Sequence, residues 1–165
     1  MISEKYQCIF IHIPKTGGTS IEKRLEHFHE LRPGVQDHRS IQDIEPVTFN
    51  DIFQCCKHFN IRRFKYLSKK LIKERATNFN YKYDTYFKFS IVRNPWSRVF
   101  SWYKNVMRDE NHRKRYNVSR HCTFQYFLNK HMDQFELKPQ MYWIMDDKGN
   151  IPLDYIGRFE NLQQE

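Results

Sequence analysis

Short apolar runs alternate along the chain with longer stretches in which apolar residues recur every three or four positions. Residues 8–13 (CIFIHI) form the first run, which ends at Pro14. A run this short and this rich in β-branched residues predicts a buried strand rather than a helix. Residues 86–92 (YFKFSIV) combine alternation with aromatic and β-branched residues and predict a second strand, and residues 153–157 predict a short last strand.

Apolar residues at helical spacing predict helices at residues 20–30, 60–75, 95–108 and 123–130. Thr19 and Glu22 form a capping-box pattern at the start of the first helix. Asn94 can cap the third helix, with Pro95 at its first position. The residues that mark one face of this third helix are Trp96, Val99, Phe100, Tyr103 and Met107.

The remaining segments are expected to connect these elements. Residues 32–46 predict a loop with one helical turn at residues 40–44, and the polar residues 109–120 predict a connecting stretch. Buried strands that alternate with helices predict a single three-layer α/β domain with a mostly parallel central sheet. The length of 165 residues agrees with one such domain over residues 1–165.

The composition adds a strong positive charge to this picture. The chain has 28 Lys and Arg against 19 Asp and Glu, a formal net charge of +9, which points to an anionic partner. No stretch approaches the ~20 apolar residues of a membrane span, and the polar start does not resemble a signal peptide, so a cytoplasmic location is expected. Four Cys without a C-x-x-C motif fit reduced thiols better than a zinc site, and no metal is expected.

Residues 13–20 (IPKTGGTS) form a P-loop-like turn between the first strand and the first helix, where an anion can bind. Backbone N–H groups converge at such a turn, glycines let a ligand approach closely, and Lys15 adds a positive charge. A Walker A loop places its lysine after the glycines, whereas Lys15 precedes Gly17 and Gly18. The reversed order argues against an ordinary ATPase. A structural turn with a surface lysine is the alternative interpretation.

A second cationic position, Arg93, follows the second strand, and Ser101 lies about two turns into the next helix. The carboxyl ends of the strands form the ligand crevice of a doubly wound sheet. We therefore expect Arg93 and Lys15 to face one bound molecule. The alternatives are a capping or salt-bridging role for Arg93 and a purely structural role for Ser101.

Residues 10–21 (FIHIPKTGGTSI) and 87–103 (FKFSIVRNPWSRVFSWY) stand out as a pair. They resemble the 5′-phosphosulfate and 3′-phosphate motifs of the sulfotransferases that depend on 3′-phosphoadenosine 5′-phosphosulfate (PAPS). The likeness is greatest to the carbohydrate branch, Golgi-type and bacterial, and residues 154–162 (DYIGRFENL) resemble a further segment of that branch.

The resemblance implies how the site is used. Lys15 would contact the oxygen that bridges the sulfate and the 5′-phosphate of PAPS, and Arg93 and Ser101 would hold the 3′-phosphate. The residues that would enclose the 5′ end are Thr16, Gly17, Gly18, Thr19 and Ser20. The implied reaction is in-line transfer of a sulfuryl group, without a metal ion, to a hydroxyl of a carbohydrate or other acceptor, including an anionic one.

A general base near neutral pKa favours histidine, and position decides between the eight in the chain. His38 follows a Pro-Gly loop and resembles the family's histidine that precedes a short helix, so it is the first candidate for the base. His58 fits the same loose pattern and is the second candidate. His12 lies inside the first strand and is expected to be a core or supporting residue. A solvated loop histidine is the alternative for His38 and His58.

Other functions remain open at this point. A P-loop-like nucleotide kinase would need a phosphoryl donor and Mg²⁺. A nucleic-acid-binding module would use the basic regions at residues 57–75 and 108–120 with their interleaved Tyr and Phe. No nucleic acid is expected as partner, because basic helices are often solvated faces. A catalytically inactive homologue that binds nucleotide is a further alternative. Family domains usually continue into a basic segment that closes over the nucleotide, and a segment of this kind is not seen before Glu165.

Overall fold

A four-stranded sheet forms the centre of the computed structural model, which describes residues 1–25, 36–57 and 61–162, without the side chains of residues 54–56. The strand order is β1 (Ile2–Ser3), β2 (Cys8–Ile11), β3 (Phe87–Val92) and β4 (Tyr155–Arg158). The short β1 pairs antiparallel with β2, while the β2–β3 and β3–β4 pairs are parallel. The predicted α/β fold with a mostly parallel sheet is therefore confirmed.

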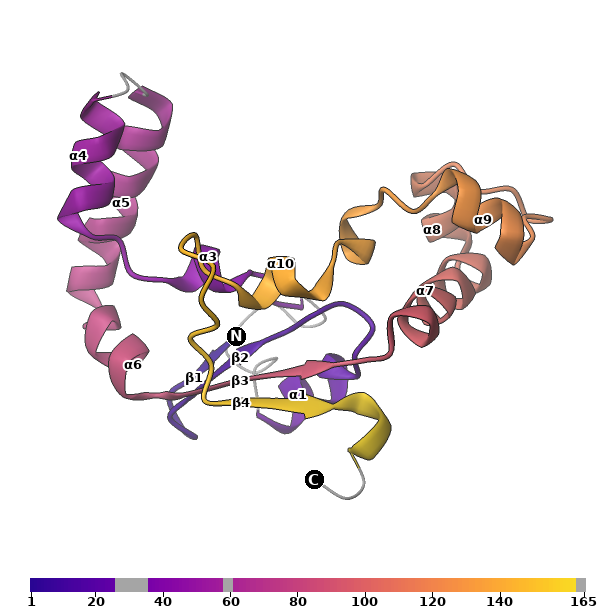
Figure 1. Cartoon of the computed structure of the whole chain (residues 1–165), viewed down its shortest axis with the longest axis horizontal. Helices are drawn as coiled ribbons and strands as arrows, with labels where there is room; N and C mark the ends of the chain where they lie inside the picture. The colour runs from indigo at the N-terminus through magenta and orange to yellow at the C-terminus, as the bar shows by residue number, and fades with distance from the viewer. Residues whose placement is uncertain (26–35, 58–60, 163–165) are drawn as a thin grey trace.

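Alternate residues of β2 and the segment after it face opposite sides of the sheet. Ile9, Ile11 and Ile13 pack in one apolar cluster with residues of α3 (Ile41–Ile44) and α10 (Gln140–Ile144). Phe10 points the other way, into a cluster that includes Ile21 of α1 (Gly18–Arg24). Helices thus cover both faces, which gives the three predicted layers (Figure 1).

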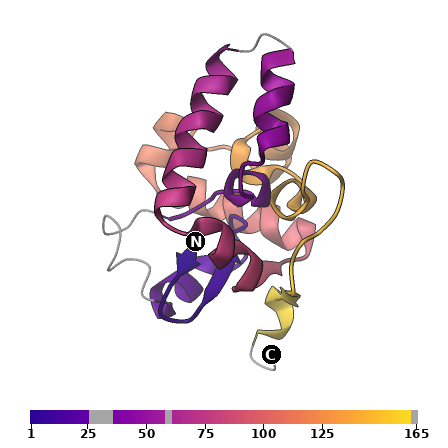
Figure 2. The ribbon, with the colours of Figure 1, turned by 90° about the vertical axis from the view of Figure 1, so that its left-hand side faces the viewer.

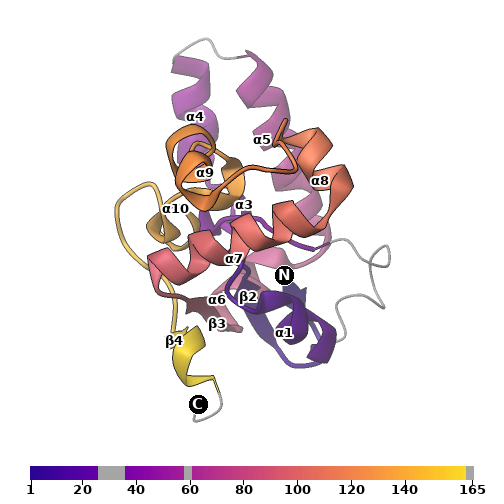
Figure 3. The same cartoon turned by 90° about the vertical axis from the view of Figure 1, so that its right-hand side faces the viewer.

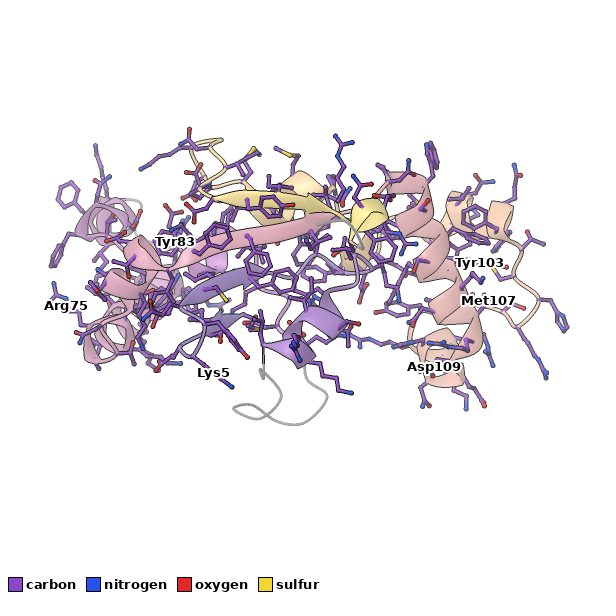
Figure 4. All side chains as sticks on the ribbon, turned by 90° about the horizontal axis from the view of Figure 1, so that it is seen from below. Lys5, Arg75, Tyr83, Tyr103, Met107 and Asp109 are labelled. Atoms are coloured by element: carbon purple, nitrogen blue, oxygen red, sulfur yellow. The ribbon has the colours of Figure 1, made fainter. Side chains whose placement is uncertain are left out.

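Two helical groups extend the molecule beyond the ends of the sheet. On one side, α4 (Phe49–Lys57) and α5 (Ile61–Ala76) form a projecting hairpin, and α6 (Phe79–Thr85) leads from it into β3 (Figure 2). On the other side lie α7 (Pro95–Arg108), α8 (Glu110–Arg115) and α9 (Phe124–Lys130) (Figure 3). Viewed from below, Arg75 and Asp109 mark these opposite ends (Figure 4).

The second helical group has an apolar core of its own. Its buried members are Val99, Trp102, Val106, Val118, Cys122, Phe127 and Leu137. Two short 3₁₀ helices, η1 (Phe135–Leu137) and η2 (Phe159–Asn161), complete the described elements. In the part of the chain that the structure describes, no helix is both long and apolar enough to cross a membrane.

The start of α1 differs from the prediction. The helix begins at Gly18, its N-cap Gly17 has a left-handed backbone, and no side chain caps it, so the expected Thr19–Glu22 capping box is wrong. Glu22 is instead fully buried. Its Oε1 atom lies close to Nδ1 of His12 and accepts a hydrogen bond from the backbone N–H of Asp37. The predicted residues 26–30 of this helix lie outside the described residues.

Other local predictions are confirmed in part. The Asn94 side chain accepts hydrogen bonds from the backbone N–H groups of Trp96 and Ser97, as expected for an N-cap. The apolar face predicted for α7 is buried only in part, because Trp96 is 72% exposed and Phe100 45% exposed. The buried apolar residues of α7 are Val99, Trp102 and Val106, of which Val99 belongs to the predicted face.

Candidate active site

The loop between β2 and α1 has a strained and internally bonded backbone. Lys15 and Gly17 both have positive φ, 69° and 85°. The buried Thr16 hydroxyl donates a hydrogen bond of 2.8 Å to the carbonyl of Ile13. Thr16 therefore closes the loop with its side chain, and the residue is fully buried in this arrangement.

Both glycines of the loop are required by close neighbours. A Cβ atom on Gly18 would lie 2.7 Å from Cγ of His12 and closer still to its Cδ2 and Nε2 atoms. A Cβ atom on Gly17 would lie 2.9 Å from Cε2 of Phe159. The loop is thus packed on His12 below and on Phe159 at its side. Glycine at position 18 is a packing requirement as well as a route for a ligand.

Arg93 meets this loop because β2 and β3 are neighbours whose carboxyl ends lie together. Its Nη1 atom donates a hydrogen bond of 3.1 Å to the carbonyl of Lys15, and its guanidinium lies 4.1 Å from the Phe159 ring centroid. The Gln140 amide fixes the backbone of Arg93 with two hydrogen bonds of 2.8 Å. The Nε atom of Arg93 is buried and has no partner among the described residues.

A cleft of about 830 Å³ joins the loop to the helical group that contains α7 and α8. The predicted site residues on its lining are Lys15, Gly17, Gly18, Thr19, Ser20, His38, Arg93 and Ser101. The structure therefore brings together residues from three separate segments of the sequence. Thr16 is not on this lining, and His58 lies outside the described residues.

One face of α7 continues the cationic surface beyond Ser101. Lys104, Asn105 and Arg108 line a hollow of about 530 Å³ together with Lys15 and Arg93. Sequence reasoning missed these residues, although Lys104 and Arg108 follow Ser101 at helical spacing. Burial lowers the pKa of the Lys15 ammonium, and the positive charges of Arg108 and Arg93 lower it further.

A buried arginine, Arg98, was also missed. It is 4% exposed and donates hydrogen bonds to the carbonyls of Glu136 (3.0 Å) and Lys138 (2.6 Å), with a longer one to Pro14 (3.4 Å). Burial lowers its pKa to about 10. Arg98 ties the start of the loop to the η1 segment, which forms the far wall of the cleft.

That far wall carries polar groups from α8 and η1. The hydroxyl of Tyr116 donates a hydrogen bond of 2.5 Å to Oε1 of Glu136. Burial, and then this bond, raise the pKa of Tyr116 to about 12. His112 and Arg115 also line the cleft. The polar sequence of residues 109–120 was expected to be a connecting stretch and gave no sign of this wall.

His38 lies on the same cleft, half-buried, with both ring nitrogens in contact with polar atoms. Its Nδ1 atom is 3.1 Å from the carbonyl oxygen of His12, and its Nε2 atom is 2.9 Å from Oε1 of Gln36. Burial lowers the pKa of His38, and His12 lowers it further. The ring is therefore largely neutral near pH 7. Both of these oxygens are acceptors, and a neutral ring has one N–H to donate. Where Nδ1 donates to His12, Nε2 is the basic atom, and the Gln36 amide must turn its NH₂ group toward the ring.

The chemistry of this lining suits a ligand with separated negative charges. Lys15 and the loop lie at one end of the cationic surface, and Arg93, Ser101 and Arg108 lie beside them. Among the described residues, no group of three or more His, Cys, Asp or Glu is placed to hold a metal ion.

Comparison with known proteins agrees with this geometry. The model of the sulfotransferase family matches residues 1–165, the whole chain. A search of curated proteins and a search of solved structures each found no significant match. The cationic cleft at the carboxyl ends of β2 and β3 is thus the candidate active site of a transferase, and the chain belongs to the sulfotransferase family.

Proposed function

We propose that the protein transfers a sulfuryl group from PAPS to a hydroxyl of a carbohydrate acceptor, with His38 as the general base. The observation that carries this proposal is that the glycine loop, Arg93 with Ser101, and His38 line one cleft. A nucleotide with phosphates at both its 5′ and 3′ positions would contact both cationic groups at once. The family match supports sulfuryl transfer in general.

The proposed contacts assign each end of the donor to residues of this chain. Lys15 and the backbone N–H groups after it would hold the 5′-phosphosulfate. Arg93 and Ser101 would hold the 3′-phosphate. The buried Nε atom of Arg93, which has no partner in the described part of the chain, supports this assignment, because an anion would supply the acceptor that it lacks.

The proposed reaction breaks one bond to sulfur and forms another. The acceptor oxygen attacks sulfur, the bond to the bridging oxygen breaks, and its electron pair stays on the departing 5′-phosphate. Lys15 would stabilise the charge that develops there. The acceptor proton moves to Nε2 of His38, which is basic when Nδ1 donates to the His12 carbonyl.

Transfer of ³⁵S-labelled sulfate from PAPS tests the proposal directly. The assay offers the protein a panel of hydroxyl acceptors, from neutral oligosaccharides to oligosaccharides that contain uronic acids, with EDTA present. We expect labelled oligosaccharide from at least one member. Transfer of phosphate from ATP with Mg²⁺ to the same panel, and no transfer from PAPS, would contradict the proposal and favour a kinase.

A further inference from the structure

Glu22 links three segments of the candidate site through one carboxylate. It lies in α1, directly after the loop, and is fully buried. Its Oε1 atom is 2.9 Å from Nδ1 of His12 in the strand before the loop. The same oxygen accepts a hydrogen bond of 3.1 Å from the backbone N–H of Asp37. A single atom thus meets the strand before the loop and the segment that carries His38.

His12 passes this linkage to the loop and to His38. Its ring packs so closely on Gly18 that a Cβ atom there would clash. Its backbone carbonyl faces Nδ1 of His38, and the two imidazole rings lie 4.3 Å apart between centroids. Any displacement of the His12 ring would therefore change its packing against both Gly18 of the loop and the ring of His38.

We propose that Glu22 is a positioning residue that holds the donor loop and the His38-bearing segment in one fixed arrangement. Its role in the reaction rests on the proposed function, in which His38 takes the acceptor proton and the loop holds the donor. Glu22 is buried and does not line the cleft, so it acts through His12 and Asp37 rather than on the substrate.

The geometry explains why a side-chain oxygen at this distance from the backbone is needed. A buried side-chain oxygen is costly unless it has partners, and Oε1 of Glu22 has two. Aspartate at position 22 would withdraw the carboxylate by one carbon bond, about 1.5 Å, and would lose contact with at least one partner. Glutamine would keep an oxygen in place of Oε1, so both contacts survive in Glu22→Gln.

A double-mutant cycle between Glu22 and His38 tests the proposal. The quantity measured is kcat for sulfuryl transfer at saturating PAPS, with the best acceptor found in the panel above. We expect Glu22→Ala to lower kcat about 10- to 100-fold, because an error of 1 Å in position has effects of this size, and Glu22→Gln to recover most of it. In the His38→Ala background, the loss of kcat from Glu22→Ala should be at least about 3-fold smaller, because only the part of its effect that runs through the donor loop remains. Equal losses in both backgrounds would overturn the proposal.

Glu74 provides a matched control for the loss of a buried carboxylate. It is 6% exposed and accepts a hydrogen bond of 2.9 Å from the backbone N–H of Val47, but it lies in α5, outside the cleft. Glu74→Ala should lower the melting temperature as Glu22→Ala does and leave kcat within about 2-fold. A loss of kcat as large as that of Glu22→Ala would show that both act through stability, and would overturn the proposal.

The ring signals of His38 in a ¹H–¹⁵N spectrum report the linkage without any reaction. They are assigned by their absence from His38→Ala. They should move in Glu22→Ala and stay in Glu74→Ala, and unchanged signals in Glu22→Ala would overturn the proposal. If His38→Ala keeps full activity while the signals move, the base of the proposed function is wrong and the linkage through Glu22 stands.

Discussion

Nη1 of Arg93 donates a hydrogen bond of 3.1 Å to the backbone carbonyl of Lys15. The two residues are 78 positions apart in the sequence and meet because β2 and β3 are adjacent parallel strands. The bond uses only one of the five guanidinium N–H donors. Arg93 can therefore hold the loop and still offer N–H groups to an anion in the cleft.

Replacement of Arg93 by alanine should weaken the binding of nucleotides with a 3′-phosphate. We expect a loss of about 1.5 to 3 kcal/mol for 3′-phosphoadenosine 5′-phosphate, as for a hydrogen bond to a charged group. Adenosine 5′-phosphosulfate, which lacks the 3′-phosphate, should be nearly unaffected. Isothermal titration calorimetry measures both ligands, with the exposed Arg62→Ala as control. Equal losses for both ligands would assign Arg93 to the loop alone.

Donor binding should weaken as the pH rises through the lowered pKa of Lys15. Burial and the neighbouring arginines lower the pKa of Lys15 from 10.5, so its positive charge is complete below that lowered pKa and is lost as the pH rises through it. A bound anion favours the charged form, and binding at alkaline pH should take up protons. Calorimetry in buffers of different ionisation enthalpy measures this uptake. Lys15→Arg, which stays charged, should remove it, and an unchanged uptake would point to another group.

Gly18→Ala should disturb the loop through the His12 ring. Overpacking of this kind costs about 1 to 3 kcal/mol in the free energy of unfolding, and donor affinity should fall as the loop shifts. Gly149→Ala is the control, since its Cβ atom meets nothing within 4 Å although its φ is 86°. It should cost about 1 to 2 kcal/mol with unchanged donor affinity. Chemical denaturation and donor titration separate the two effects, and intact donor affinity in Gly18→Ala would argue against the tight loop packing.

His38→Ala should lower transfer by roughly 10²- to 10⁴-fold while donor affinity stays near that of the parent protein. Burial lowers the pKa of His38 below the usual 6.5. The neutral, basic form therefore persists to lower pH, and kcat should fall only as the pH drops through that lowered pKa. A pH–rate profile with its acid limb above 6.5, or full activity of His38→Ala, would remove His38 as the base.

The part of the cleft that could be predicted from the sequence consists of residues directly next to a strand end in the chain. The strand, the glycine turn and Arg93 each stand next to the element that positions them, so spacing alone placed them at neighbouring strand ends. Glu22 was assigned to a local capping box because its partners, His12 and Asp37, are 10 and 15 residues away. Arg98 gave no local sign either, since it bonds to carbonyls brought together by the fold.

The helices that line the cleft show a second limit. The polar residues of α8 lack an apolar stripe, and the helix is held by its cap, in which the Asp109 side chain accepts from the N–H groups of Asn111 and His112. Three residues of the cleft wall, Arg108, Arg115 and Glu136, and Lys104 of the adjoining hollow belong to elements whose packing decides which side chains face these cavities. No pattern in the sequence specifies that packing.

The proposed function requires the cleft to bind a nucleotide with phosphates at both its 5′ and 3′ positions. The most direct test is the binding of 3′-phosphoadenosine 5′-phosphate in the presence of EDTA. Calorimetry should show one site per chain, and saturation at about 100 times Kd should stabilise the fold by about 2.7 kcal/mol. ATP with Mg²⁺ should bind more weakly, because it offers no 3′-phosphate to Arg93 and Ser101. Tighter binding of ATP with Mg²⁺, and none of the 3′-phosphorylated nucleotide, would contradict the account.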